Sequence, residues 1–169
     1  MKPRFIGIGG QRCGTAWIYN CLDEHPELCL PQKELNFFVH DEKYTQGNSW
    51  YENQFGSCKS YALAGEMSSL YLYDDQAPDR IYHFDPNLLL IASIRNPAER
   101  TYSAYLNGIA AGEIPKELIF ESALQQYPDL LEKSLYAPGL TRYKSYFGSK
   151  LLVVIYEELV ANPEKSFTQ

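Results

Sequence analysis

Apolar residues along the chain gather into four short runs, each too brief for a typical helix, and these runs predict β-strands. The predicted strands are residues 5–8, 62–65, 88–94 and 151–155. The third run is apolar at nearly every position, which is typical of a parallel strand covered on both faces. The pattern therefore predicts a buried, largely parallel sheet.

Between these runs, the spacing of apolar residues predicts helices. The predicted helices are residues 15–25, 49–55, 75–83, 97–111, 117–126 and 140–147, with a last one starting near Pro163. Residues 33–49 and 112–116 are predicted to be exposed loops. Strands that alternate with helices indicate an α/β sandwich, in which ligands gather at the carboxyl ends of the strands.

The composition is that of a globular protein, and 169 residues with 45% hydrophobic content predict one domain over residues 1–169. A net charge of -6 argues against a nucleic-acid partner, because nucleic-acid binders show a basic face. An anionic ligand must therefore be held by a local cluster of donors rather than by the charge of the whole protein.

The cysteines and the length of the apolar runs indicate in which cellular compartment the protein is found. Cys13, Cys21, Cys29 and Cys58 lack paired C-x-x-C spacing, which argues against a metal site. We interpret them as reduced, mostly buried thiols. Neither a signal peptide nor a run of about 20 apolar residues is found. The sequence thus predicts a cytoplasmic protein that makes no membrane contact.

The first segment with candidate chemistry is the glycine-rich turn in residues 5–16, Phe-Ile-Gly-Ile-Gly-Gly-Gln-Arg-Cys-Gly-Thr-Ala. Glycines let the backbone approach a phosphate, and the N–H groups at a helix N-terminus attract an anion. Gly9 and Gly14 have the spacing of a standard phosphate loop, but Thr15 follows Gly14 with no lysine between them. The cation is Arg12 instead, which argues against an ordinary ATP or GTP site. A tight turn that binds nothing is the alternative.

The second segment begins with Arg95, at the carboxyl end of the third predicted strand, on the sheet edge where residues 9–15 should lie. Arg100 and Ser103 are three residues apart on one face of the next helix. A guanidinium fork with a hydroxyl suits a second phosphate. The alternative is that the arginines form solvated ion pairs with carboxylates such as Glu99.

The third segment places Glu34 shortly before an aromatic pair, Phe37 and Phe38. Apolar neighbours suit a carboxylate to general-base work, whereas the adjacent Lys33 opposes that effect. An exposed Lys–Glu loop is the alternative interpretation. The aromatic residues of this region, including Trp50, indicate ring stacking with an acceptor.

The fourth segment follows the second predicted strand at the same sheet edge. Glu66 and the hydroxyl groups of Ser68, Ser69 and Tyr71 either line a substrate cleft or cap the following turn.

In this order, the segments resemble the sulfotransferases that use 3′-phosphoadenosine-5′-phosphosulfate (PAPS), above all the branch with heparan sulfate sulfotransferases and their bacterial relatives. Residues 10–15 resemble the family's loop around the 5′-phosphosulfate, and residues 94–105 resemble its Arg-x-Pro-x-x-Arg-x-x-Ser-x-Tyr element at the 3′-phosphate. Residues 33–38 resemble its Lys-Glu-x-x-Phe-Phe segment. Weaker likenesses at residues 44–51 and 156–163 extend the resemblance over essentially the whole chain.

Three positions depart from the family pattern. Arg12 replaces the loop lysine, and Met67 stands where many relatives have a lysine after Glu66. The chain also stops at Gln169, where the family usually continues, so we expect a domain that lacks its C-terminal segment.

The resemblance implies a three-layer α/β sandwich with a central parallel sheet, like that of the P-loop nucleoside triphosphate hydrolases. It implies a sulfotransferase that moves a sulfuryl group from PAPS to an acceptor hydroxyl or amine and releases adenosine 3′,5′-bisphosphate, without a metal. The acceptor is expected to be a small molecule or a carbohydrate, and the oligomeric state stays open. A small metabolite kinase and a PAPS-binding module without activity are the alternatives.

The resemblance also implies a role for each matched residue. Glu34 is expected to act as general base and Arg12 as a second catalytic residue. The residues expected to contact the donor are Gly10, Gln11, Arg12, Cys13, Gly14, Thr15, Ala16, Arg95 and Ser103. The residues expected to contact the acceptor are Lys33, Phe37, Phe38, Glu66 and Ser68.

Overall fold

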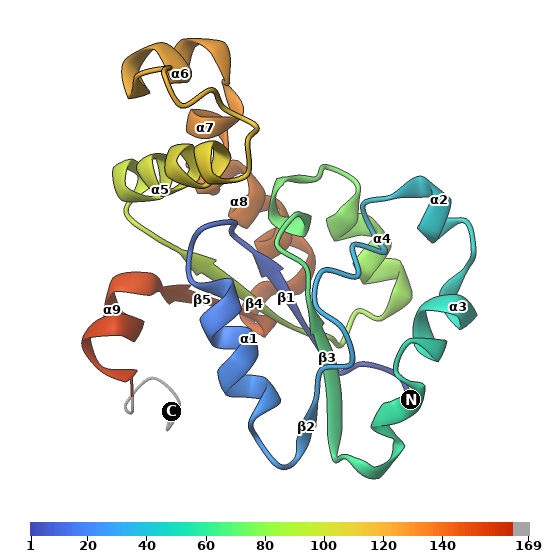
Figure 1. Cartoon of the computed structure of the whole chain (residues 1–169). Helices are drawn as coiled ribbons and strands as arrows, with labels where there is room; N and C mark the ends of the chain where they lie inside the picture. Colours follow the sequence, from blue (N-terminus) through green and yellow to red (C-terminus); the bar gives the residue numbers. More distant parts are fainter. Residues whose placement is uncertain (164–169) are drawn as a thin grey trace.

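In the computed structural model, which describes residues 1–163, five parallel strands form one sheet in the order β2-β3-β1-β4-β5 (Figure 1). The strands are β1 (Phe5–Gly9), β2 (Leu28–Cys29), β3 (Leu63–Met67), β4 (Leu89–Ile94) and β5 (Leu151–Ile155). All four predicted strands are confirmed to within two residues at each end. The edge strand β2 was not predicted, because two residues are too few to show a periodicity.

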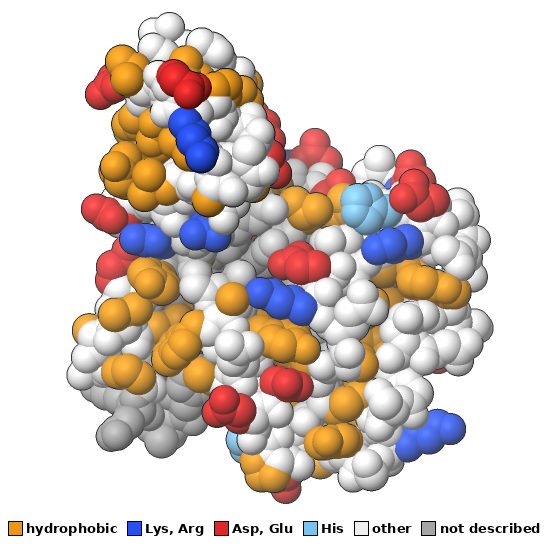
Figure 2. Space-filling model, in the orientation of Figure 1, with side chains coloured by type: hydrophobic (Ala, Val, Ile, Leu, Met, Phe, Trp, Pro, Cys, Tyr) orange, Lys and Arg blue, Asp and Glu red, His pale blue; other side chains and the backbone are white. Residues whose placement is uncertain are grey.

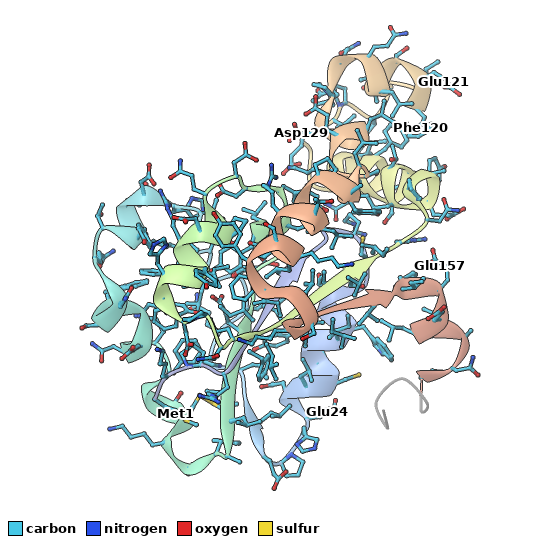
Figure 3. All side chains as sticks on the ribbon, turned by 180° about the vertical axis from the view of Figure 1, so that it is seen from behind. Met1, Glu24, Phe120, Glu121, Asp129 and Glu157 are labelled. Atoms are coloured by element: carbon cyan, nitrogen blue, oxygen red, sulfur yellow. A yellow bond between two sulfur atoms is a disulfide. The ribbon has the colours of Figure 1, made fainter. Side chains whose placement is uncertain are left out.

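Helices cover both faces of the sheet, which confirms the three-layer prediction. Helix α1 (Thr15–Asp23) lies on one face, and α4 (Ala77–Phe84) and α8 (Tyr136–Phe147) lie on the other (Figures 1 and 3). The short helices α2 (Asp41–Tyr44) and α3 (Asn48–Asn53) lie beside the β3 end of the sheet.

A lobe stands above the carboxyl ends of the strands and is built from α5 (Pro97–Ala110), α6 (Phe120–Gln126) and α7 (Asp129–Glu132) (Figure 1). It has its own small core, in which Tyr105, Ile114, Ala123 and Leu130 are buried. Residues 112–116 connect α5 to α6 without regular structure, as predicted.

Several helix boundaries differ from the prediction. Helix α8 begins at Tyr136, four residues before the predicted start, because Pro138 is tolerated in a first helical turn. The last described helix, α9 (Tyr156–Ala161), follows β5 directly. The helix predicted from Pro163 onwards lies outside the described residues apart from Pro163 itself.

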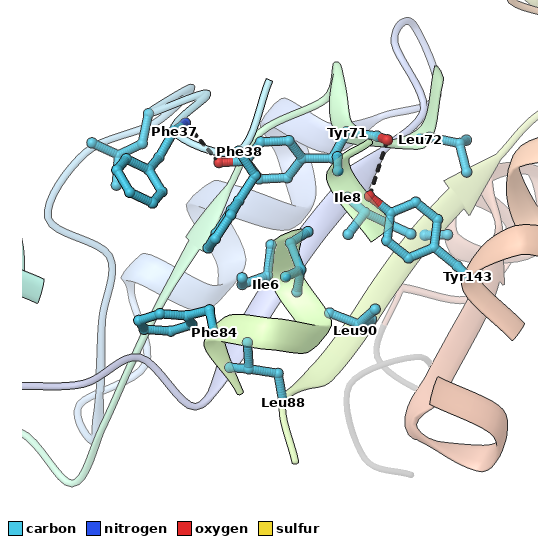
Figure 4. Close-up of a cluster of buried hydrophobic side chains, with 14 of the residues drawn as sticks. Ile6, Ile8, Phe37, Phe38, Tyr71, Leu72, Phe84, Leu88, Leu90 and Tyr143 are labelled. Carbon is cyan, nitrogen blue, oxygen red and sulfur yellow. Dashed lines mark hydrogen bonds between the residues drawn. The ribbon is translucent and has the colours of Figure 1, made fainter. Parts of the chain in front are cut away.

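The larger hydrophobic core lies on the face covered by α4 and α8 (Figure 4). In β1, Ile6 and Ile8 point into this core, whereas Phe5 packs in a second cluster with Ile18 of α1. This alternation follows from the period of two along a strand, which sends successive side chains to opposite faces.

The prediction of an exposed loop over residues 33–49 is wrong for much of that segment. It contains α2, and Leu35, Phe37 and Phe38 are buried in the larger core.

The interpretation of all four cysteines as reduced thiols is also wrong for two of them. Cys29 of β2 and Cys58 form a disulfide, while Cys13 and Cys21 are free. Between residues 1 and 163, no group of three or more potential ligand side chains is placed to hold a metal ion. None of the helices described there is long and apolar enough to cross a membrane.

Candidate functional site

A cleft of about 920 Å³ opens between the α5–α7 lobe and the carboxyl ends of the strands. In Figure 2, basic and acidic side chains gather around the hollow below the lobe. The predicted site residues that line the cleft are Gln11, Arg12, Gly14, Thr15, Ala16, Lys33, Glu34, Arg95 and Ser103. Ser69 of the fourth segment also lines it, so the cleft brings together residues from all four segments singled out in the sequence.

The glycine-rich loop between β1 and α1 presents unused backbone donors. Within residues 1–163, the N–H groups of Arg12, Gly14, Thr15 and Ala16 have no acceptor, and all of these residues line the cleft. Groups of this kind at the start of a helix are suited to bind an anion, since the positive end of the helix dipole lies at the same point.

Gly14 is required by the geometry of this loop. Its φ is +80°, in the left-handed region that favours glycine. A Cβ atom at this position would lie 2.6 Å from the ring of Tyr156, the first residue of α9. The loop and Tyr156 are thus packed too closely for any side chain between them.

The Arg12 side chain reaches from the loop to the lobe. Its Nε donates to Ser103 Oγ at 3.2 Å, and its Nη1 donates to Asn107 Oδ1 at 2.9 Å. Ser103 and Asn107 share one face of α5 because they are four residues apart. Asn96 caps the N-terminus of this helix, since its Oδ1 accepts hydrogen bonds from the N–H groups of Ala98 and Glu99.

Arg95 follows β4 directly and lines the same cleft as the glycine-rich loop. Its guanidinium lies 4.8 Å from the ring centre of Tyr156, and its terminal nitrogen pairs with Glu99 at 3.3 Å. Its Nε is buried and has no hydrogen-bond partner in the described part of the chain. A buried donor without a partner is unfavourable, so this nitrogen is suited to a ligand oxygen. Arg12 and Arg95 therefore face a common cleft, as predicted.

Arg100 does not form the solvated ion pair that was the alternative interpretation. It is 2% exposed, and it donates to the carbonyl oxygens of Gln11 and Leu130 and to Ser134 Oγ. These bonds join the glycine-rich loop to the α5–α7 lobe, and Arg100 also lines the cleft between them.

Glu34 lies at the cleft in a loop held against the end of β3. Its φ is +57°, its N–H donates to the Met67 carbonyl at 2.8 Å, and its Oε2 accepts the Ser69 N–H at 2.9 Å. Lys33 also lines the cleft, with its Nζ 5.9 Å from the ring centre of Tyr19. The carboxylate is thus held in a defined place while it faces the cleft.

Four residues expected at the acceptor do not line the cleft, so that expectation is wrong. Phe37, Phe38, Glu66 and Ser68 each have no exposed surface. The two phenylalanines pack edge to face at 4.9 Å inside the larger core, because the chain turns inward after Glu34. Glu66 and Ser68 hydrogen-bond to each other beneath the surface.

Two residues expected at the donor also do not line the cleft. The Gly10 N–H donates to the Ser93 carbonyl at 2.6 Å, beneath the loop. The Cys13 thiol is fully buried against the Tyr136 hydroxyl, and this burial raises the pKa of the thiol. Both residues shape the loop from its inner side.

Several residues that line the cleft were not predicted as site residues from the sequence. These are, among others, Trp17, Asn107, Asp129, Lys133 and Tyr156. Two of them carried a usable signal: Asn107 is one helical turn after Ser103, and Tyr156 follows the last predicted strand at the carboxyl edge. The α7 residues carried none, because only tertiary packing places them over the cleft.

Residues 2–169 match the family described as the sulfotransferase domain. The chain belongs to this family. The resemblance inferred from the sequence motifs is thereby confirmed.

Curated relatives of this chain are longer than the chain itself. Heparan sulfate glucosamine 3-O-sulfotransferase 5 of Mus musculus is 26% identical over 172 residues, which cover 95% of this chain and 50% of that protein. Bifunctional heparan sulfate N-deacetylase/N-sulfotransferase 2 of Homo sapiens is 31% identical over 97% of this chain and 21% of that protein. The chain therefore spans half or less of the length of these relatives.

Solved structures show the same fold. A sulfotransferase from Alicyclobacillus acidocaldarius has a TM-score of 0.86 and 24% identity, over 98% of this chain and 78% of that one. The sulfotransferase domain from the curacin biosynthetic pathway has a TM-score of 0.74 and 15% identity, over 100% of this chain and 72% of that one. The predicted α/β fold of the P-loop nucleoside triphosphate hydrolase type is confirmed.

Proposed function

We propose that this chain transfers a sulfuryl group from PAPS to a hydroxyl or amine of an acceptor and releases adenosine 3′,5′-bisphosphate. The observation that carries the proposal is that Arg12, with the free N–H groups of its loop, and Arg95 line one cleft. Membership of the sulfotransferase domain family supports it.

The unused donors of the cleft fit a nucleotide that carries phosphate groups at two places. The N–H groups of Arg12, Gly14, Thr15 and Ala16 form one set, to which Thr15 adds a hydroxyl. The partnerless Nε of Arg95 belongs to a second set, with the Ser103 hydroxyl of α5, which lines the same cleft. In this proposal the first set holds the 5′-phosphosulfate and the second holds the 3′-phosphate.

The chemistry that these residues would perform follows from their charge. The bound donor supplies the sulfuryl group. Arg12 and the loop N–H groups stabilise negative charge on the phosphate that leaves, as fixed donors do in related phosphoryl transfers. Glu34 takes the proton from the acceptor, because a carboxylate held at the cleft is a suitable general base. Its bond from the Ser69 N–H keeps it oriented.

The acceptor is proposed to be a carbohydrate or another small hydroxyl compound. The printed names of two relatives refer to heparan sulfate, which is a carbohydrate. The cytoplasmic location predicted from the sequence stays a prediction, and the Cys29–Cys58 disulfide instead favours an oxidising compartment.

Two measurements test the proposed function. Calorimetry should show that adenosine 3′,5′-bisphosphate binds more tightly than ATP, since the cleft offers donors for a 3′-phosphate. Incubation with sulfur-labelled PAPS and a panel of sugars, phenols and amines should give a labelled product, and Arg12→Ala should abolish it. Tighter binding of ATP would favour a kinase, and nucleotide binding without transfer to any acceptor would favour a binding module.

A further inference from the structure

Glu66 is a fully buried carboxylate at the end of β3, outside the cleft. Its Oε1 accepts the hydroxyl protons of Tyr51 at 2.7 Å and Tyr71 at 2.8 Å, and its Oε2 accepts that of Ser68 at 2.7 Å. Burial raises the pKa of Glu66 above its ordinary value, and the hydrogen bonds from these hydroxyls offset only part of this shift. Burying a carboxylate costs folding free energy. A glutamate that is kept in the core and surrounded by hydrogen-bond donors is therefore expected to have a structural or functional role.

Two of these hydroxyls continue to the loop that carries Glu34. Tyr71 Oη accepts the Phe37 N–H at 2.9 Å, and Ser68 Oγ accepts the Asn36 N–H at 2.9 Å. A hydroxyl has one proton to donate and lone pairs with which to accept. An ionised Glu66 only accepts, so it turns both hydroxyl protons toward itself and leaves the lone pairs of both oxygens for the backbone N–H groups.

The loop needs such support because its backbone is unfavourable by itself. Glu34 and Asn36 have φ values of +57° and +51°, in the left-handed region that side chains other than glycine rarely adopt. The two N–H groups that reach Glu66 through hydroxyls belong to Asn36 and to the next residue, Phe37. The Ser69 N–H, which binds the Glu34 carboxylate, is adjacent to Ser68 in the chain.

The geometry points to Glu66 as a positioning residue that acts through Ser68 and Tyr71. It fixes the left-handed loop of residues 34–37 and thereby holds the Glu34 carboxylate at the cleft. This role deepens the proposed function and rests on it, because Glu34 has a proton to take only if the chain transfers a group to an acceptor.

Tyr51 offers a matched control. It is fully buried like Tyr71, and it donates to the same carboxylate oxygen. In the described range its hydroxyl accepts no hydrogen bond, so it has no branch to the loop backbone. Tyr51→Phe and Tyr71→Phe remove the same atom and leave Glu66 with the same number of donors. Only Tyr71→Phe also removes the acceptor of the Phe37 N–H.

Two readouts test the role. Amide hydrogen exchange at Asn36 and Phe37, measured without any ligand, reports whether the loop is held. We expect exchange at Phe37 to accelerate in Tyr71→Phe and exchange at Asn36 to accelerate in Ser68→Ala, while Tyr51→Phe resembles the parent at both amides. In sulfate transfer, Tyr71→Phe and Ser68→Ala should lower kcat on the order of tenfold with KM for PAPS nearly unchanged, because misplacement of a reacting group slows the chemical step. Tyr51→Phe should keep the parent kcat.

The outcomes separate this inference from the proposed function. If Tyr51→Phe and Tyr71→Phe behave alike in both readouts, Glu66 is a stability element only and the inference is wrong. Faster exchange with an unchanged kcat also overturns it, since the loop would then be held without consequence for transfer. A parent chain that transfers no sulfate refutes the proposed function, and exchange at the two amides still decides whether Glu66 holds the loop.

Discussion

Arg12 and Asn107 are 95 residues apart in the chain, and the Arg12 guanidinium donates to the Asn107 side-chain oxygen at 2.9 Å. The bond joins the glycine-rich loop to α5, across the cleft in which the donor nucleotide is proposed to bind. Together with the bond from Arg12 Nε to Ser103 Oγ, it sets the direction of the Arg12 side chain.

The first prediction concerns this bond. Asn107→Ala should lower kcat by roughly threefold to tenfold, because an arginine that has lost one of its partners spends less time in the productive orientation. Affinity for adenosine 3′,5′-bisphosphate should change little, because the backbone donors of the loop remain. Asn53→Ala, on the exposed surface of α3, is the control and should match the parent. An unchanged kcat in Asn107→Ala would show that the bond has no part in turnover.

Arg95→Ala should weaken the binding of adenosine 3′,5′-bisphosphate by tenfold or more in calorimetry, since a charge-assisted donor to phosphate is lost. The affinity of Arg95→Lys should lie between those of Arg95→Ala and the parent, because lysine keeps the charge but loses the planar guanidinium that lies over the Tyr156 ring. Arg142→Ala serves as control, because Arg142 pairs with Asp75 and does not line the cleft. Normal affinity in Arg95→Ala would contradict its assignment to the 3′-phosphate.

Glu34→Gln should lower the rate of sulfate transfer by about a hundredfold, the usual scale for the loss of a general base. Glutamine keeps an oxygen that can accept the Ser69 N–H, so the loop and the thermal midpoint should be preserved. Nucleotide affinity, measured by calorimetry, should also be preserved. A variant as fast as the parent would remove Glu34 as the base.

Gly14→Ala and Gly112→Ala form a matched pair for the geometry of the loop. Both glycines have similar φ values, +80° and +75°, so each substitution should cost about 1 kcal/mol of unfolding free energy from backbone strain. Only at Gly14 does the new methyl group meet another side chain, the Tyr156 ring, whereas nothing lies within 4 Å at Gly112. Urea unfolding should therefore show a larger loss for Gly14→Ala, and only this variant should lose nucleotide affinity. Equal effects would show that Tyr156 moves freely aside.

The Cys29–Cys58 disulfide should contribute to stability, because it joins residues 29 apart in sequence and restricts the unfolded chain. On the loop-entropy estimate, its removal costs about 3.6 kcal/mol. Urea unfolding with and without a reductant measures this loss, and a variant with Cys29→Ala and Cys58→Ala should not respond to the reductant. A parent chain that also ignores the reductant would show that the bridge does not form in solution.

The placement of Arg12 and Arg95 could be predicted because it depends on a simple rule. Each residue follows an apolar run, and the carboxyl ends of parallel strands lie at one edge of the sheet. The rule needs only the strands and their direction. The burial of Phe37 and Phe38 did not follow from any such rule, because the charged residues Lys33 and Glu34 come shortly before them and no periodicity marks the point at which the chain turns inward.

The role of Glu66 was equally invisible in the sequence. A glutamate at the end of a strand with a serine two residues later indicates a polar edge, and the cleft was the natural place for it. The structure instead surrounds the carboxylate with hydroxyls from Tyr51 and Tyr71, which come from separate elements. The assignment of this residue therefore depended on long-range packing.

By itself, the sequence determined the strands, the glycine-rich loop, the two arginines and the family, since each of these is recorded in local spacing and in residue type. Only the tertiary structure decided which polar residues face the cleft and which are buried, because that choice depends on side chains brought together from distant parts of the chain. Hydrogen bonds and close packing act over a few ångströms in space, and neighbours in space need not be neighbours in sequence.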